Sequence, residues 1–166
     1  MAMRLTSDTF RDGDYLGNEQ VLSSEFGFGC GGDNVSPQLR WDGAPPETKS
    51  FAITCYDPDA PTGSGFWHWV VVNIPAPVTE LSLGAGDPTA DKLPEGALQV
   101  CTDTGKPGYA GPCPPEGDHP HRYIFTVFAV STESLPVTSD TPAAVVGFNL
   151  HFTTLEKATL MGLFKR

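Results

Sequence analysis

Two segments of the sequence carry side chains that could bind an anion or transfer a proton. In the first, DPDAP at 57–61, a proline separates Asp57 from Asp59 and holds both carboxylates in a defined turn. His68 follows eleven residues after Asp57, within the aromatic run FWHWV. Taken separately, the two carboxylates could simply cap turns, and His68 could be a hydrogen-bonded core histidine.

The second segment, GPCPPEGDHPHRYIFTVFAV at 111–130, leads from a proline-rich loop into an extended stretch. Side chains alternate along a strand, so His121 and Tyr123 face one side and Arg122 faces the other. The imidazole and the phenol supply hydrogen-bond donors, and a nearby carboxylate could fix the histidine tautomer or accept from a protonated phosphate. These residue types suit the binding of an anion, and they also suit general acid–base catalysis.

Three extended segments are expected to position these side chains. Residues 50–56 show the alternation of a strand, which ends at Asp57. Residues 66–74 are rich in aromatic and β-branched side chains and apolar on both sides, which is typical of a central strand. Residues 121–130 supply the third segment, and we expect all three to be neighbours in one sheet or sandwich.

Loops and short helices are expected elsewhere. Residues 76–120 contain glycine, proline and short polar runs. This segment is far longer than an ordinary connection in a compact domain. The Thr-Pro pair at 141–142 resembles a helix start, and Thr153 with Glu156 resembles a capping box, so we expect one or two short C-terminal helices. We expect 162–166 to return to extended structure. Strands first and helices last predict a mainly β sandwich rather than an alternating βαβ order.

Composition limits the class of protein. The chain has 166 residues, with no internal repeat and no break in composition, so we expect a single domain over 1–166. A net charge of -10 opposes binding to nucleic acid and to anionic membrane surfaces. No stretch approaches the ~20 apolar residues that span a bilayer, and the first residues lack the apolar run of a signal peptide. We therefore expect a cytoplasmic protein without stable membrane insertion.

The four cysteines are expected to be free thiols. Cys30, Cys55, Cys101 and Cys113 have neither CxxC spacing nor the density of a disulfide scaffold. Disulfides are also rare in the cytoplasm, the compartment inferred above.

The spaced motifs resemble the phosphatidylethanolamine-binding protein family, whose animal members include the Raf kinase inhibitor protein. The resemblance rests on DPDAP, on HWVVVNIP at 68–75 and on the PP-x-G-x-x-x-HRY pattern at 114–123. CGGDNVSPQLRW at 30–41 is similar to the bacterial and archaeal branch, and FNLHF at 148–152 extends the match over almost the whole chain. The resemblance implies a two-sheet β-sandwich with a few short, mostly C-terminal helices and a shallow pocket for phosphate-like or carboxylate groups.

Residue by residue, the resemblance implies that five side chains line this pocket: Asp57, His68, Pro115, His121 and Tyr123. The segments that carry Asp59 and Arg122 must then lie close together, while the neighbouring side chains face the pocket. We therefore expect Asp59 and Arg122 to form an ion pair on the far side of the site.

Together these observations predict a non-catalytic binding module, without cofactor or metal, for a small anionic ligand such as a phospholipid head group. Its affinity should fall as the pH rises through the histidine range. Two alternatives stay open: an inhibitor that binds a kinase or a serine protease, as some relatives do, and a hydrolase that uses the Asp/His pocket. The resemblance also allows a homodimer, in which Trp67 or Trp69 would anchor the interface instead of packing in the core.

Three weaker patterns are interpreted as incidental. GFGCGG at 27–32 fits GxGxxG but has no preceding strand and no following helix. His119 and His121 could bind zinc together with His68, but no thiolate spacing accompanies them. Ser64 lies in GSG rather than in a G-x-S-x-G elbow, and Cys113 between prolines has no evident base.

Overall fold

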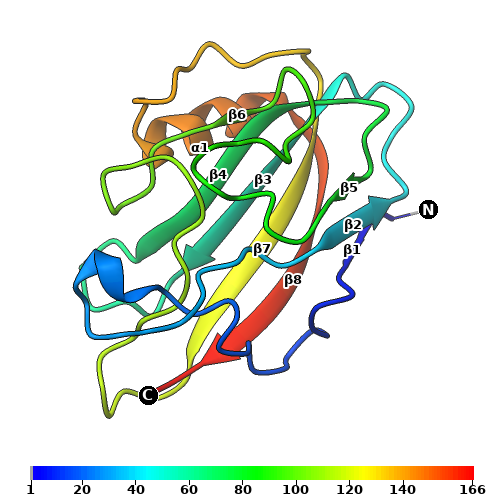
Figure 1. The fold of residues 1–166 in the computed structure, drawn as a ribbon. Coiled ribbons are helices and arrows are strands. Elements are labelled where there is room, and N and C mark those ends of the chain that lie inside the picture. The colour runs from blue at the N-terminus through cyan, green and yellow to red at the C-terminus, as the bar shows by residue number, and fades with distance from the viewer. Residues whose placement is uncertain (1) are drawn as a thin grey trace.

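The fold consists of two antiparallel sheets that pack face to face (Figure 1). The computed structural model describes residues 2–166. One sheet has three strands in the order β1-β2-β5, and the other has five in the order β6-β4-β3-β7-β8. This mainly β, two-sheet architecture confirms the predicted fold class. In chain order the elements are β1 (Arg4–Thr6), the 3-10 helix η1 (Ser24–Phe26), β2 (Leu39–Asp42), β3 (Ser50–Asp57), β4 (Phe66–Pro75), β5 (Glu80–Leu81), β6 (Leu98–Gln99), β7 (His121–Val130), α1 (Ala143–Thr153) and β8 (Thr154–Phe164).

The three predicted strands are neighbours at the centre of the larger sheet. β3 lies between β4 and β7, so that Cys55 pairs with Trp69 on one side and with Phe125 on the other. Burial along β3 is nearly continuous because one face meets the smaller sheet and the other meets the layer that contains α1. The ends of these strands are therefore held in fixed positions, and so are the polar residues that lie there.

The last strand replaces a helix that the sequence predicted. The Thr-Pro pair at 141–142 does precede α1, but Thr153 is the last residue of that helix and Glu156 pairs with Ala129 in the sheet. β8 pairs with β7 from Val130 opposite Thr154 to His121 opposite Phe164. The predicted capping box is therefore wrong, because this long-range pairing outweighs a local helix-start pattern.

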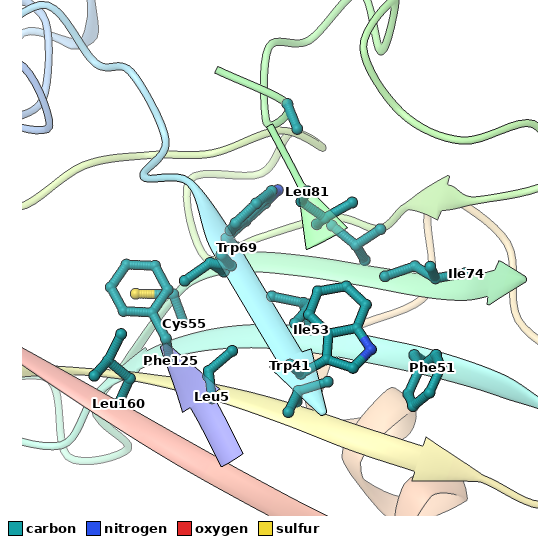
Figure 2. Close-up of a cluster of buried hydrophobic side chains, with 14 of the residues drawn as sticks. Leu5, Trp41, Phe51, Ile53, Cys55, Trp69, Ile74, Leu81, Phe125 and Leu160 are labelled. Atoms are coloured by element: carbon teal, nitrogen blue, oxygen red, sulfur yellow. The ribbon is translucent and has the colours of Figure 1, made fainter. Parts of the chain in front are cut away.

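The main core lies between the two sheets (Figure 2). Trp41 from the smaller sheet packs on Phe51 from the larger one, with ring centroids 5.4 Å apart. Trp69 is fully buried in this cluster, so it serves packing and not an exposed interface. Trp67 is half-buried and packs on the second cluster, which joins the outer face of the sheet to α1.

In the described part of the chain, no helix has the length and hydropathy needed to cross a bilayer.

Candidate functional site

The candidate site lies at one edge of the larger sheet, where three neighbouring strands begin or end. β3 ends at Asp57 opposite Phe66, the first residue of β4, and β7 begins beside them at His121. A pocket of about 140 Å³ opens at this edge, and its walls include apolar side chains from the long loops. All five side chains predicted for the pocket line it: Asp57, His68, Pro115, His121 and Tyr123.

His68 reaches the pocket through an irregularity in strand pairing. Cys55 pairs with Trp69, but the next residue of β3 pairs with Trp67, so His68 is an extra residue between two paired positions. A bulge of this kind re-aims a side chain that regular alternation would send to the other face. The ring of His68 therefore packs edge-on against Tyr123, with 5.2 Å between ring centroids.

His121 is clamped between two carboxylates. Its Nδ1 donates to Asp57 Oδ2 at 2.7 Å and its Nε2 donates to Asp118 Oδ2 at 2.9 Å. Burial alone would lower the pKa of His121, but hydrogen bonds to Asp57 and Asp118 outweigh burial, so its pKa is raised above 6.5. Because both ring nitrogens face carboxylates, His121 is an imidazolium, and the sequence reasoning missed Asp118 as its second partner.

The pKa of His68 is shifted in the opposite direction from that of His121. It is 7% exposed, and burial lowers its pKa below 6.5 although the Ala110 carbonyl and the charge of Asp57 act in the other direction. Nδ1 donates to the Ala110 carbonyl at 2.7 Å, which fixes the neutral tautomer with a free lone pair on Nε2. Neutral His68 therefore offers the pocket a hydrogen-bond acceptor at Nε2 rather than a donor.

Tyr123 supplies a hydroxyl that stays protonated. The side chain is 1% exposed, and burial together with the nearby charge of Asp57 raises the pKa of the phenol far above its ordinary value. Among residues 2–166 its hydroxyl makes no hydrogen bond, so it can donate to a ligand.

The predicted ion pair between Asp59 and Arg122 is confirmed. Arg122 donates to Asp59 from Nε at 3.0 Å, from a terminal nitrogen at 2.9 Å and from its backbone N–H at 2.9 Å. These contacts lower the pKa of Asp59 to about 2. Neither side chain lines the pocket, so the pair fastens the turn after β3 to the start of β7 from outside.

Asn34 holds the loop that positions His68. Its side-chain amide donates to the Tyr109 carbonyl at 3.0 Å and its Oδ1 accepts from the Gly111 N–H at 2.8 Å, so it brackets Ala110. Ala110 in turn contacts His68 twice, through its carbonyl and through its N–H. The φ of Asn34 is +55°, a left-handed conformation that asparagine tolerates better than most residues.

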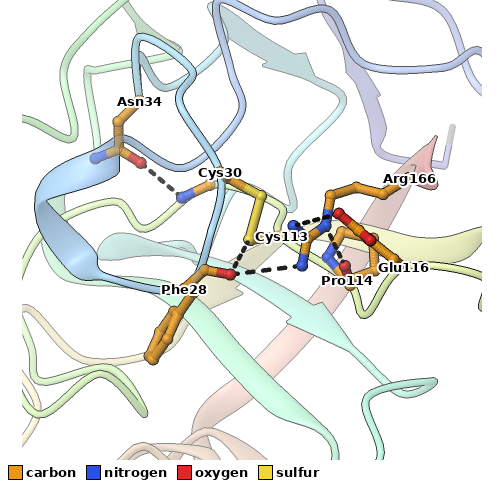
Figure 3. The surroundings of a disulfide bond; sticks show 8 residues. Phe28, Cys30, Asn34, Cys113, Pro114, Glu116 and Arg166 are labelled. Carbon is orange, nitrogen blue, oxygen red and sulfur yellow. Dashed lines mark hydrogen bonds and ion pairs between the residues drawn. A yellow bond between two sulfur atoms is a disulfide. The ribbon is translucent and has the colours of Figure 1, made fainter.

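A disulfide joins two loops of the pocket wall (Figure 3). Cys30 and Cys113 lie 83 residues apart in sequence, and their Cα atoms are 5.9 Å apart, a distance that suits a bridge. The prediction of free thiols is therefore wrong for this pair, because the fold brings together loops whose proximity spacing cannot reveal. It is confirmed for Cys55 and Cys101.

Arg166 reinforces the same wall. Its Nε donates to the Pro114 carbonyl at 2.7 Å and a terminal nitrogen donates to the Phe28 carbonyl at 3.5 Å (Figure 3). Phe28, Pro114 and Pro115 all line the pocket. Arg166 thus helps to set the shape of the pocket.

Comparison with known proteins decides the family. A sequence profile of the phosphatidylethanolamine-binding protein family matches residues 6–165. The chain belongs to this family. UPF0098 protein YbcL of Escherichia coli (strain K12) is 49% identical over 164 residues, covering 99% of this chain and 88% of the relative. UPF0098 protein YbhB of the same organism is 51% identical over 162 residues, covering 98% and 99%.

Solved structures agree with this assignment. The crystal structure of E. coli YbcL, described as a new member of the mammalian PEBP family, superimposes with a TM-score of 0.96 at 48% identity and covers 100% of this chain and 99% of its own. A carboxypeptidase Y inhibitor, solved in complex with its cognate proteinase, has a TM-score of 0.56 at 20% identity and covers 99% and 82%. The second likeness supports the fold alone.

Two residues of the site that the sequence analysis missed, Asn34 and Asp118, do have weak signals in the sequence. Asn34 stands inside the CGGDN motif that carries part of the family resemblance, but its contacts depend on a loop some 75 residues away in sequence. Asp118 stands three residues before His121, a spacing that would prompt a search for an ion pair. Among residues 2–166, no group of three or more His, Cys, Asp or Glu is arranged to hold a metal ion.

Proposed function

We propose that this family member is a non-catalytic binding protein whose pocket accepts a small anionic head group, either phosphate-like or carboxylate. The observation that carries the proposal is the ring of His121, which is hydrogen-bonded through both nitrogens to carboxylates and lines the pocket together with Tyr123. This pairing favours the imidazolium form. Hydrogen bonds from a charged donor are roughly twice as strong as neutral ones, and the low-dielectric surroundings strengthen them further. His68 adds an acceptor for a protonated phosphate oxygen.

Tyr123→Phe provides the direct test, because it removes one donor and keeps the ring that packs in the core. Inorganic phosphate would be titrated into both proteins by calorimetry. We expect binding to weaken by about 10- to 100-fold, since a hydrogen bond to a charged group contributes roughly 1.5–3 kcal/mol. Tyr15→Phe is the matched control, because Tyr15 is 56% exposed and lies outside the pocket. Equal affinity of Tyr123→Phe and the unmodified protein would refute the assignment.

The pH dependence of binding offers an independent check. The pKa of His121 is raised, so the loss of affinity with rising pH should occur above 6.5 rather than at it. His68 has a lowered pKa, so a second gain in affinity should appear only in more acidic solution, where its Nε2 becomes a donor. Sulfate is a suitable probe because it does not titrate in this range. A flat profile would remove the imidazolium from the binding model.

Inhibition of a kinase or a serine protease through protein contacts is a second candidate function. Exposed apolar side chains on α1 favour it, since Val145, Phe148 and Phe152 are 45%, 66% and 70% exposed. The carboxypeptidase Y inhibitor shares the fold at low identity, and binding to the proteinase is a property of that protein. A pull-down from cell extract distinguishes the functions: a partner retained by the His68→Ala, His121→Ala double variant would bind outside the pocket.

Hydrolysis is the least favoured alternative. The Nε2 atom of His121, which would act as the base, is bonded to Asp118, and Cys113 is in a disulfide. Among residues 2–166, no hydroxyl or thiol is hydrogen-bonded to either pocket histidine. A panel of phosphate and carboxylate esters tests this alternative, and turnover that disappears in His121→Ala would favour an enzyme.

We further propose one domain over 1–166 that assembles as a homodimer. The core shared by both sheets supports the single domain, and the apolar face of α1 could pair with a second copy. Cytoplasmic residence is a separate proposal, and the bridge between Cys30 and Cys113 counts against it, because disulfides are rare in reducing compartments. Alkylation of thiols in intact cells tests it: both cysteines found reduced would support residence in the cytoplasm, and full oxidation would place the protein in an oxidising compartment.

A further inference from the structure

Asp118 does not itself line the pocket, but it takes up the second ring nitrogen of His121, a residue that does. It accepts a hydrogen bond from Nε2 at 2.9 Å, on the opposite side of the ring from Asp57, which accepts from Nδ1 at 2.7 Å. The side chain of His121 is 1% exposed, whereas that of Asp118 is 37% exposed. The one strong cationic donor of the pocket is therefore already paired with a carboxylate of the chain itself.

The two carboxylates differ in how firmly they are held. Asp57 is 2% exposed and also accepts from the backbone N–H of Asp59 at 2.8 Å. Within residues 2–166, the carboxylate of Asp118 accepts only the bond from His121. Asp118 also follows Gly117, which has a φ of +87° and open space where a Cβ would lie. Asp118 can therefore turn into solvent at the loss of one hydrogen bond, whereas Asp57 cannot.

We propose that Asp118 is a built-in competitor for the anion: it pairs with Nε2 of His121 while the pocket is empty and yields this position to a ligand. The inference rests on the proposed function and adds the residue that sets its affinity. The exchange keeps the buried imidazolium paired at every stage, because one charge-assisted hydrogen bond replaces another. A ligand must outcompete a tethered carboxylate, whose effective concentration is millimolar or higher for a short flexible connection.

Such a competitor also selects the class of ligand. A carboxylate offers Nε2 the same chemistry as Asp118 and gains little by replacing it. A tetrahedral phosphate-like group has further oxygens, which can accept from the Tyr123 hydroxyl and, when protonated, donate to Nε2 of His68. Asp118 therefore favours phosphate-like groups over carboxylates, and its removal should admit both.

Calorimetric titrations of sulfate and of acetate, at constant pH and ionic strength, test the proposal on four proteins. These are the unmodified protein, Asp118→Ala, Asp118→Asn and the control Asp140→Ala. Asp140→Ala changes the net charge by the same amount as Asp118→Ala. Asp140 is exposed and lies outside the pocket, so this control changes the charge without changing the site. Asp118→Asn keeps a weaker, neutral acceptor, and it keeps the test available if Asp118→Ala does not fold.

We expect Asp118→Ala to bind sulfate at least about tenfold more tightly than the unmodified protein, with Asp118→Asn between them and Asp140→Ala unchanged. Acetate should gain more than sulfate, because the competitor excludes it more. If the unmodified protein binds sulfate and both Asp118 variants bind it equally or more weakly, the competitor role is wrong and the proposed function stands. If no variant binds sulfate, the competitor role is wrong, and if none binds acetate either, the proposed function fails as well.

Discussion

The ion pair between Asp59 and Arg122 makes a prediction about stability that can be worked from the structure. The pKa of Asp59 falls from an ordinary value of 3.8 to about 2. At 1.36 kcal/mol per pKa unit, this difference corresponds to about 2.4 kcal/mol of folding free energy at neutral pH. Arg122 is half exposed, so solvent screening reduces the expected coupling to about 1–2 kcal/mol.

The pH dependence of this contribution follows from the direction of the shift. A depressed pKa stabilises the fold above the unfolded value of 3.8, and the stabilisation is lost as the pH falls toward about 2. About half of it should remain at pH 3. The coupling energy measured at pH 3 should therefore be roughly half of that at pH 7.

A double-mutant cycle measures the coupling directly. Asp59→Asn, Arg122→Gln and the double variant would be unfolded in urea at both pH values, and the non-additive part of the free energy of unfolding is the coupling. The pair between Arg4 and Asp42 is the matched control, because those side chains are 70% and 58% exposed, and its coupling should be smaller. Additivity within about 0.3 kcal/mol at pH 7 would show that the pair does not fasten the two segments.

Three further predictions concern the pocket wall, the loop beneath it and the surface of α1. Replacing both Cys30 and Cys113 with serine should lower the free energy of unfolding in urea by about 2–4 kcal/mol, since the bridge spans 83 residues, and an unchanged midpoint would contradict it. Asn34→Ala leaves two backbone groups without partners, so it should cost about 2–3 kcal/mol in the same assay and also weaken phosphate binding; full affinity would exclude its role in holding His68. If the protein is a dimer, light scattering should find monomers after Phe148 and Phe152 are both changed to serine, and a persistent dimer would place the interface elsewhere.

Much of the fold could be predicted because its signals are local. Alternation and aromatic content placed β3, β4 and β7 within a residue of their observed ends. The same alternation put His121 and Tyr123 on one face and Arg122 on the other. The pair with Asp59 also needed the family resemblance, which implied that the two motif segments lie close together.

What could not be predicted depends on contacts between distant segments. The bulge that aims His68 exists only in the pairing of β3 with β4, and the disulfide needs two loops that lie 83 residues apart. Glu156 belongs to a strand because β7 offers a full-length partner, which no local pattern reveals. The tautomer of His68 likewise depends on a carbonyl, that of Ala110, some 42 residues further along the chain.

The central claim is that an anion binds at the wall formed by His121 and Tyr123. A crystal structure determined with phosphate tests it most directly. We expect phosphate oxygens within hydrogen-bonding distance of Nε2 of His121 and of the Tyr123 hydroxyl, with Asp118 turned toward solvent. A pocket that stays empty in saturating phosphate, or a phosphate bound only elsewhere on the surface, would contradict the account.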